Sequence, residues 1–191
     1  MKQTIIAVIC FLCVSSLYIQ AQKINHPSLL YTPQRIQQVK QRMQHEPKLQ
    51  EAWGDIKKTA DEALQKKDFN RLDYLSLAYL VTDNKEYADA IKEILLKAVE
   101  AESWGDVEMM ARIPAWRSQL GMAHKSFLSA VGYDAAYNVM SSSERKKIAE
   151  GLKRLAVEPA LGDWLLEPTR IHSLNSMGHN WWTSCVCQGG I

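Results

Sequence analysis

The sequence predicts an all-α fold, an incomplete α/α toroid built of antiparallel helical hairpins. Apolar residues recur at helical spacing along most of the chain, and almost no segment alternates apolar with polar residues as a half-buried strand would. Capping and turn residues separate these helical segments at short intervals. A superhelical repeat array also fits, but the helix-turn-helix unit at 75–98 has no second copy in the sequence.

Length and charge narrow the possible functions. The chain has 191 residues, which suits one domain or one large piece of a domain. Its formal net charge is only +2, whereas nucleic-acid binding usually shows as a strong basic excess on one face. We therefore expect no nucleic-acid partner. A mean hydropathy of −0.25 argues against a polytopic membrane protein.

Residues 1–21 have the pattern of a secretory signal peptide. Lys2 precedes an apolar run at 5–14, and small residues lead to a cleavage position at Ala21. The run is shorter than the roughly 20 apolar residues that a spanning helix needs, although an uncleaved membrane anchor is the alternative. We expect a periplasmic or extracellular protein that does not contact the membrane once the signal is cleaved. Residues 22–191 would then form the N-terminal part of the toroid domain.

The first half of the mature chain should hold four helices. The first begins at Pro33, with Thr32 as its N-cap, and Pro47 closes it. The pattern of apolar residues predicts further helices over about 48–66, 71–81 and 86–101. Asp83 and Asn84 make the turn between the last two.

The second half should alternate helices with longer loops. Three helices are predicted: one over about 118–139, one that begins at the capping sequence Ser141 to Glu144, and one that begins near His179. Loops are predicted at 103–117 and 159–176. The apolar pattern continues to Ile191 without a cap. We therefore expect the chain to be a fragment of a longer protein.

A dense polar and aromatic cluster is the first candidate site. It consists of Arg170, His172, Asn175, Ser176, His179, Asn180, Trp181 and Trp182. Tryptophan faces can stack on sugar rings, and Trp104, Trp116 and Trp164 lie in or beside the predicted loops, where they could line the same cleft. At least one of Trp181 and Trp182 should point into the core, because consecutive residues on a helix point about 100° apart. The pair His179 and Asn180 has either a site role or a capping role.

Several reaction classes lack their sequence motifs. The sequence has no phosphate-cradling glycine loop, no Gly-x-Ser-x-Gly elbow and no His-Glu-x-x-His motif, which argues against nucleotide enzymes, α/β hydrolases and zinc proteases. Cys185 and Cys187 have no further ligands to complete a tetrahedral metal site. We expect neither a metal nor another cofactor.

Three segments, in this order and spacing, resemble a known family. The first segment runs from His26 to Pro33 and leads into a helix with Arg35 and Ile36. The second is a helix from Leu120 that contains Gly132, Tyr133, Asp134 and Tyr137, and it precedes the capping sequence with Glu144 and Arg145. The third consists of His179, Asn180, Trp181 and Trp182, followed by Gly189 and Gly190. Together they resemble the exported heparinase II/III-like polysaccharide lyases over most of residues 26–191.

The resemblance implies a fold and a reaction. The N-terminal part of this family is an incomplete α/α toroid, and a β-sandwich follows it, here beyond Ile191. The implied reaction is β-elimination on a polysaccharide that contains uronic acid. The implied substrate is of the glycosaminoglycan type, with heparin and heparan sulfate among the candidates. An amide donor stabilises the negative charge of the substrate carboxylate by hydrogen bonding, a base removes the proton at C5, and an acid protonates the leaving oxygen O4.

The same resemblance assigns residues. Asn180 is the candidate donor to the substrate carboxylate, with His179 as its helper or alternative. Arg170, His172, Trp181 and Trp116 are candidate contacts to the acidic polysaccharide or oligosaccharide substrate. The Tyr and His that act as acid and base are expected downstream of Ile191, because Tyr133 and Tyr137 fall in a packed helix. We therefore expect this fragment alone to be inactive.

Two alternatives remain open from the residues. An α/α-toroid glycoside hydrolase would use two carboxylates, for which Asp106, Glu108 and Asp163 are the candidates. A non-catalytic carbohydrate-binding or helical-repeat scaffold protein would bind sugar without cleaving it, through Trp104, Trp116, Trp181 and Trp182.

Overall fold

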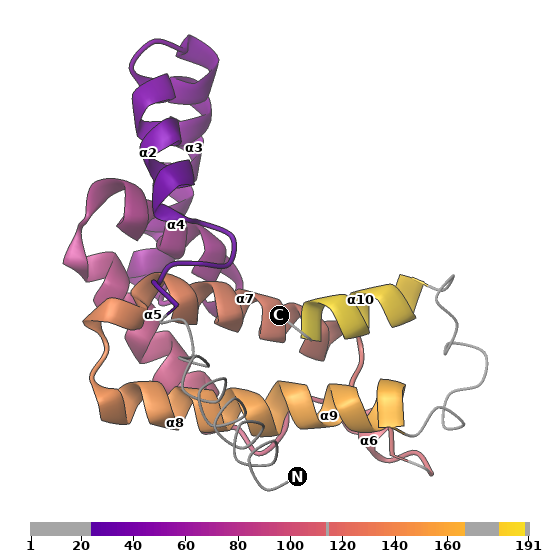
Figure 1. Cartoon of the computed structure of the whole chain (residues 1–191). Helices are drawn as coiled ribbons and strands as arrows, with labels where there is room; N and C mark the ends of the chain where they lie inside the picture. Colours follow the sequence, from indigo (N-terminus) through magenta and orange to yellow (C-terminus); the bar gives the residue numbers. More distant parts are fainter. Residues whose placement is uncertain (1–23, 114, 167–179, 190–191) are drawn as a thin grey trace, which may run out of the picture.

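The computed structural model describes residues 24–113, 115–166 and 180–189 (Figure 1). Every regular element in these ranges is helical, so the prediction of an all-α fold is confirmed. Within the same ranges, no helix is both long and apolar enough to cross a membrane. The predicted signal peptide and the candidate residues Arg170, His172 and His179 lie outside the described residues.

Helices α2 (Pro33–Met43) and α3 (Pro47–Lys66) form a hairpin that stands out from the rest of the molecule (Figure 1). The start of α2 agrees with the prediction, because the Thr32 hydroxyl accepts a hydrogen bond from the Arg35 N–H at 3.3 Å and Pro33 is the first helical residue. Helix α3 ends at Lys67, whose backbone adopts a left-handed conformation with φ of 49°.

A short 3-10 turn, η1 (Phe69–Arg71), leads into the second hairpin of α4 (Leu72–Thr82) and α5 (Lys85–Ala98). The predicted turn between these helices is confirmed. Asp83 takes a left-handed conformation with φ of 58°, and the Asn84 side chain accepts a hydrogen bond from the Glu86 N–H at 3.0 Å.

Helix α7 (Leu120–Ala136) lies at the centre of the fold and packs against α4, α5 and α10 (Asn180–Gly189). A Cβ atom at Gly132 would lie 3.3 Å from side-chain atoms of both Leu72 and Ile91, so this glycine lets α7 approach both helices of the second hairpin. The main core forms here, and its large fully buried residues include Leu72, Leu75, Ile91, Leu95, Met122, Leu128 and Ile148.

Helix α8 (Ser142–Leu152) begins with the predicted capping box. The Ser141 N–H donates to the Glu144 carboxylate at 2.7 Å, and the Ser141 hydroxyl accepts from the Glu144 N–H at 3.2 Å. A Cβ atom at Gly151 would lie 2.4 Å from the Cβ of Val99, so only glycine allows α8 to pass so close to the end of α5.

The prediction of a loop from residue 159 is wrong for residues 159–166. Helix α8 continues through η3 (Lys153–Val157), α9 (Glu158–Ala160) and η4 (Leu161–Leu166), of which η3 and η4 are π-helical, and α8 and α9 form one long rod (Figure 1). Before Pro159 the wider turn is visible in the bond from the Glu158 N–H to the Lys153 carbonyl. Such a turn accommodates a proline that has no N–H of its own.

Smaller differences concern the other helix ends. The predicted loop at 103–117 contains one short helix, α6 (Val107–Met110). Helix α7 begins two residues later than predicted and is followed by the 3-10 turn η2 (Tyr137–Val139). Helix α5 ends at Ala98 rather than near residue 101. The toroid closure and the β-sandwich stay predictions.

Candidate functional site

Asn180 is the first residue of α10 and is exposed to solvent. The helix lies against α7 (Figure 1). Three of its side chains, those of Trp181, Trp182 and Cys185, belong to or pack on a second core cluster. Trp181 and Trp182 are half-buried, and Cys185 is fully buried. The predicted start of the last helix at His179 thus agrees with the structure to within one residue.

A second core cluster lies beneath α10, and we call it the tryptophan cluster. Its buried members are Trp116, Ala123, Trp164 and Cys185, and Met109, Trp181, Trp182 and Val186 pack against them. The ring centroids of Trp116 and Trp181 are 4.9 Å apart, and those of Trp116 and Trp164 are 6.0 Å apart in an edge contact. Trp104 belongs instead to the main core, so the three loop tryptophans do not line one cleft.

Trp116 packs against the ring of Trp181 from the side of the core. Its side chain is 7% exposed, and its indole N–H donates to the Ser118 carbonyl at 2.8 Å. The indole N–H of Trp164 donates to the same carbonyl at 2.9 Å. Both rings are therefore fixed by hydrogen bonds as well as by packing. Little of the predicted substrate contact Trp116 is left exposed, and its role in this arrangement is to hold the ring of Trp181.

Asp163 fixes the loop that carries Trp116. The buried carboxylate of Asp163 accepts hydrogen bonds from the N–H groups of Arg117 at 2.6 Å and Ser118 at 2.8 Å. The guanidinium of Arg117 also donates to it at 2.9 Å. Both carboxylate oxygens are thus engaged by this loop, which is unlike the solvent-reaching acid that a glycoside hydrolase requires.

The other hydrolase candidates have local structural roles or lie at the surface. Asp106 is the N-cap of α6, and its carboxylate accepts from the N–H groups of Glu108 at 3.0 Å and Met109 at 3.2 Å. Glu108 is exposed. Asp106 is exposed as well, so neither residue forms a buried pair with Asp163.

Cys185 is not a nucleophile in this setting. Burial, together with the nearby negative charge of Asp163, raises the pKa of the Cys185 thiol to about 12. The thiol is therefore protonated at neutral pH, and only a thiolate attacks carbon or binds metal well. Across the described ranges, no group of three or more His, Cys, Asp or Glu side chains is placed to hold a metal ion.

The two segments that carry the N-terminal part of the resemblance are in direct contact. Asp134 on α7 is buried and accepts hydrogen bonds from the N–H groups of Ser28 at 2.8 Å and Leu29 at 2.9 Å. The Nδ1 atom of His26 lies 2.6 Å from the same carboxylate. The aspartate of the Tyr-Asp-x-x-Tyr helix thus attaches the opening segment to the centre of the fold.

The tyrosines of that helix have packing roles. The Tyr133 hydroxyl donates to the Arg145 carbonyl at 3.4 Å, and burial raises the pKa of Tyr133 above its ordinary value. The ring of Tyr137 stacks on His26 with centroids 3.8 Å apart, and the Arg145 guanidinium carbon lies 4.7 Å from its centroid.

Sequence reasoning missed two features of this region. It did not identify Asp134 and Asp163 as the side chains that hold loops distant in sequence, because nothing close to either residue marks its partner. It also gave no sign that Arg117 and Ser118 position the tryptophans.

No family model, no curated protein and no solved structure matches the chain.

Proposed function

We propose that this chain is the N-terminal toroid portion of an exported polysaccharide lyase that cleaves uronic acid-containing polysaccharides of the glycosaminoglycan type by β-elimination. The resemblance of the three segments supports the proposal, as does an all-α fold of successive helical hairpins. The contact between Asp134 and the segment at 26–29 supports it further, because it joins two of the segments that carry the resemblance.

The observation that carries the proposal is the position of Asn180. Its amide stands exposed at the first residue of a ten-residue helix, whose leading N–H groups have no partner within the helix. A neutral amide can donate to a carboxylate without adding charge, and the positive end of the helix dipole favours an anion there. This is a suitable place for the carboxylate of a uronic acid.

The reaction then follows from the acidity of the substrate. The proton at C5 is weakly acidic because its removal places a second negative charge next to the carboxylate. Hydrogen bonds from Asn180 stabilise this charge as it develops. A base takes the C5 proton, the electron pair forms the C4–C5 double bond, the bond from C4 to O4 breaks, and an acid gives O4 its proton.

Trp181 is the proposed platform for a sugar ring beside Asn180. Its own ring packs on Trp116, which is held by Ser118, and the loop of Ser118 is held by Asp163. A platform fixed in this way loses little conformational entropy when a ligand binds. His179, Arg170 and His172 complete the proposed site, His179 as the helper or alternative to Asn180 and the other two as substrate contacts.

The test is an assay of the full-length product of the gene on polysaccharides that contain uronic acid. A lyase leaves an unsaturated uronate, which absorbs ultraviolet light. Asn180→Ala should abolish this absorbance and leave the helical circular dichroism unchanged, and Asn180→Asp should do the same because it adds a like charge. Thr183→Ala, an exposed change on the same helix, is the control and should retain activity.

The outcomes separate the candidate functions. Undiminished activity in Asn180→Ala would contradict the site assignment. New reducing ends without ultraviolet absorbance would indicate a hydrolase. Binding of the polysaccharide without any cleavage would favour the non-catalytic carbohydrate-binding protein.

A further inference from the structure

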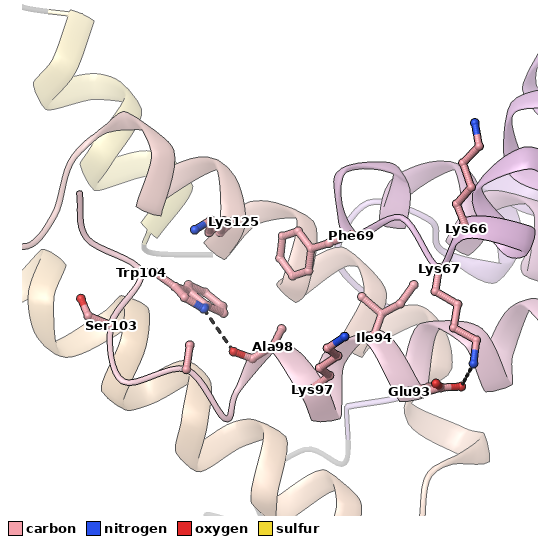
Figure 2. Close-up of a pocket in the computed structure, with 11 residues that line it drawn as sticks. Lys66, Lys67, Phe69, Glu93, Ile94, Lys97, Ala98, Ser103, Trp104 and Lys125 are labelled. Carbon is pink, nitrogen blue, oxygen red and sulfur yellow. Dashed lines mark hydrogen bonds and ion pairs between the residues drawn. The ribbon is translucent and has the colours of Figure 1, made fainter. Parts of the chain in front are cut away.

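A cavity of about 620 Å³ opens beside the main core (Figure 2). It lies between the end of α3, the turn η1, the second half of α5, the segment at 101–104 and Lys125 of α7. Pockets of about 300–1,000 Å³ are the usual size for small organic ligands. None of its lining residues belongs to the tryptophan cluster.

The floor of this cavity is apolar and aromatic. Phe69 and Trp104 meet there edge to face with ring centroids 6.2 Å apart, beside the buried Ile94 (Figure 2). The indole N–H of Trp104 donates to the Ala98 carbonyl at 3.2 Å, which fixes the ring and uses its only donor. The floor therefore offers a rigid apolar surface for a ligand to cover.

The rim of the cavity is positively charged. Four lysines and a single glutamate line it, and that glutamate, Glu93, is ion-paired with Lys67. In the described part of the chain, no carboxylate pairs with Lys97 or Lys125. Figure 2 shows these two lysines on either side of the aromatic floor, whereas the ammonium group of Lys66 points away from it.

We infer that this cavity binds an acidic sugar unit, whose carboxylate or sulfate lies between Lys97 and Lys125 and whose ring covers Phe69. Three features point to such a ligand: an open cavity of suitable size, an aromatic floor and two ammonium groups with which no carboxylate of the described residues is paired. Flexible lysine stems let both ammonium groups move onto one anion. The choice of a sugar as the bearer of the anion rests on the proposed function, and the site is a second contact for the polysaccharide, separate from Asn180.

The experiment measures binding directly and needs no catalysis. The secreted protein is titrated in a calorimeter with a short uronic acid oligosaccharide, with its carboxyl-reduced neutral counterpart and with inorganic sulfate. Lys97→Gln and Lys125→Gln should each weaken binding of the acidic oligosaccharide about tenfold, because each removes one charge-assisted hydrogen bond. Raising the salt concentration should weaken binding by the parent protein more than by the double variant.

Matched controls isolate the cavity from general charge effects. Lys58→Gln removes the same charge from the exposed face of α3, outside the cavity lining. This variant should bind like the parent. Phe69→Leu keeps an apolar side chain on the floor but removes the ring, and it should weaken the oligosaccharide several-fold without affecting inorganic sulfate.

Several results would overturn the inference. The first is that the double lysine variant binds the acidic oligosaccharide as tightly as the parent protein does, and the second is that the parent does not bind it at all. The inference would also be overturned if the parent bound the carboxyl-reduced oligosaccharide, or inorganic sulfate, as tightly as the acidic oligosaccharide. Lysine-dependent binding, together with no unsaturated product from the full-length product of the gene, would support the cavity and contradict the lyase, so the two proposals fail separately.

Discussion

Two buried aspartates in this molecule use the same chemistry in two different regions. Asp134 and Asp163 each accept two consecutive backbone N–H groups and contact one cationic or titratable side chain, His26 in the first case and Arg117 in the second. Asp134 reaches a segment 105 to 108 residues away in sequence, whereas Asp163 reaches one 45 or 46 residues away. The regions differ in what the aspartate holds.

The Asp134 region attaches the segment at 26–29 to α7, and the Asp163 region holds the loop beneath the candidate site. Residues 26–29 lie against α7 at the surface, with Leu29 exposed. Arg117 and Ser118 instead lie under the tryptophan cluster, where the Ser118 carbonyl accepts from two indoles. We expect loss of Asp163 to disturb the site and loss of Asp134 to free the segment at 26–29 while leaving the site intact.

The largest expected effect is that of Asp163→Ala. The substitution leaves the N–H groups of Arg117 and Ser118 without their acceptor in a buried place, and we expect the free energy of unfolding to fall by about 3 kcal/mol. Urea denaturation measures this loss. Tryptophan emission should also shift, because Trp116 and Trp164 are held through Ser118.

Asp163→Asn is the matched variant, since it keeps the shape and one acceptor oxygen, and its loss should be smaller. Should Asp163→Ala unfold at the same urea concentration as the parent, the carboxylate would have no part in holding the floor of the site.

The next effect is that of Asp134→Ala, for which we expect a loss of about 2 kcal/mol because the segment it holds is partly solvated. Limited proteolysis should cut within residues 24–31 much faster than in the parent, and tryptophan emission should stay unchanged. A shift in emission would mean that the two regions are not independent.

His26 contributes less, and two variants divide its contribution. His26→Phe keeps a ring on Tyr137 but removes the hydrogen bond to Asp134, which should lower the free energy of unfolding by about 1 kcal/mol. His26→Ala removes the stacking as well and should cost more. Equal losses for the two variants would show that the ring contact with Tyr137 adds nothing, and both are read from urea unfolding curves.

The smallest expected effect concerns the reactivity of the two cysteines in α10, and it involves no change in the free energy of unfolding. Because the pKa of the buried Cys185 thiol is raised to about 12, its thiolate fraction at neutral and mildly alkaline pH is very low. A maleimide should therefore label the exposed Cys187 first and the buried Cys185 much more slowly, at alkaline pH or on unfolding. Labelling is followed by mass spectrometry of peptides.

Asp163→Asn sharpens this comparison. It removes the smaller of the two causes of the raised pKa, so the pKa of Cys185 should fall and its labelling should begin at a lower pH. Burial, the larger cause, remains and should keep Cys185 slower than Cys187. Rapid labelling of Cys185 in the folded parent would contradict the packing of α10 on the tryptophan cluster.

Much of the fold could be predicted because its signals are local. The start of α2 at Thr32 and Pro33, the turn at Asp83 and Asn84 and the capping box of α8 are each made by residues within four positions of one another. The helical structure of residues 159–166 could not be predicted, because a proline normally ends a helix. Here the π-helical turns on either side of Pro159 let the helix continue.

The candidate site was predictable only in part. Asn180, Trp181 and Trp182 were chosen as candidates from the density of polar and aromatic residues in the sequence, and their role in a site stays a prediction. The burial of Trp116 and Trp164 was not predicted, because the side chain of a tryptophan in or beside a loop can point either into the core or toward solvent. The rim lysines of the second cavity come from α5 and α7, so no single stretch of sequence brings them together.

The sequence by itself determined the all-α fold, the helix starts and the residues that could carry chemistry, because hydrogen bonds and side-chain caps within one or two helical turns fix these features. The tertiary structure decided which side chains are buried, which loops Asp134 and Asp163 hold, and which lysines meet over an aromatic floor. These outcomes depend on contacts between residues tens of positions apart, and they form only when the apolar faces of α4, α5, α7 and α10 are packed together.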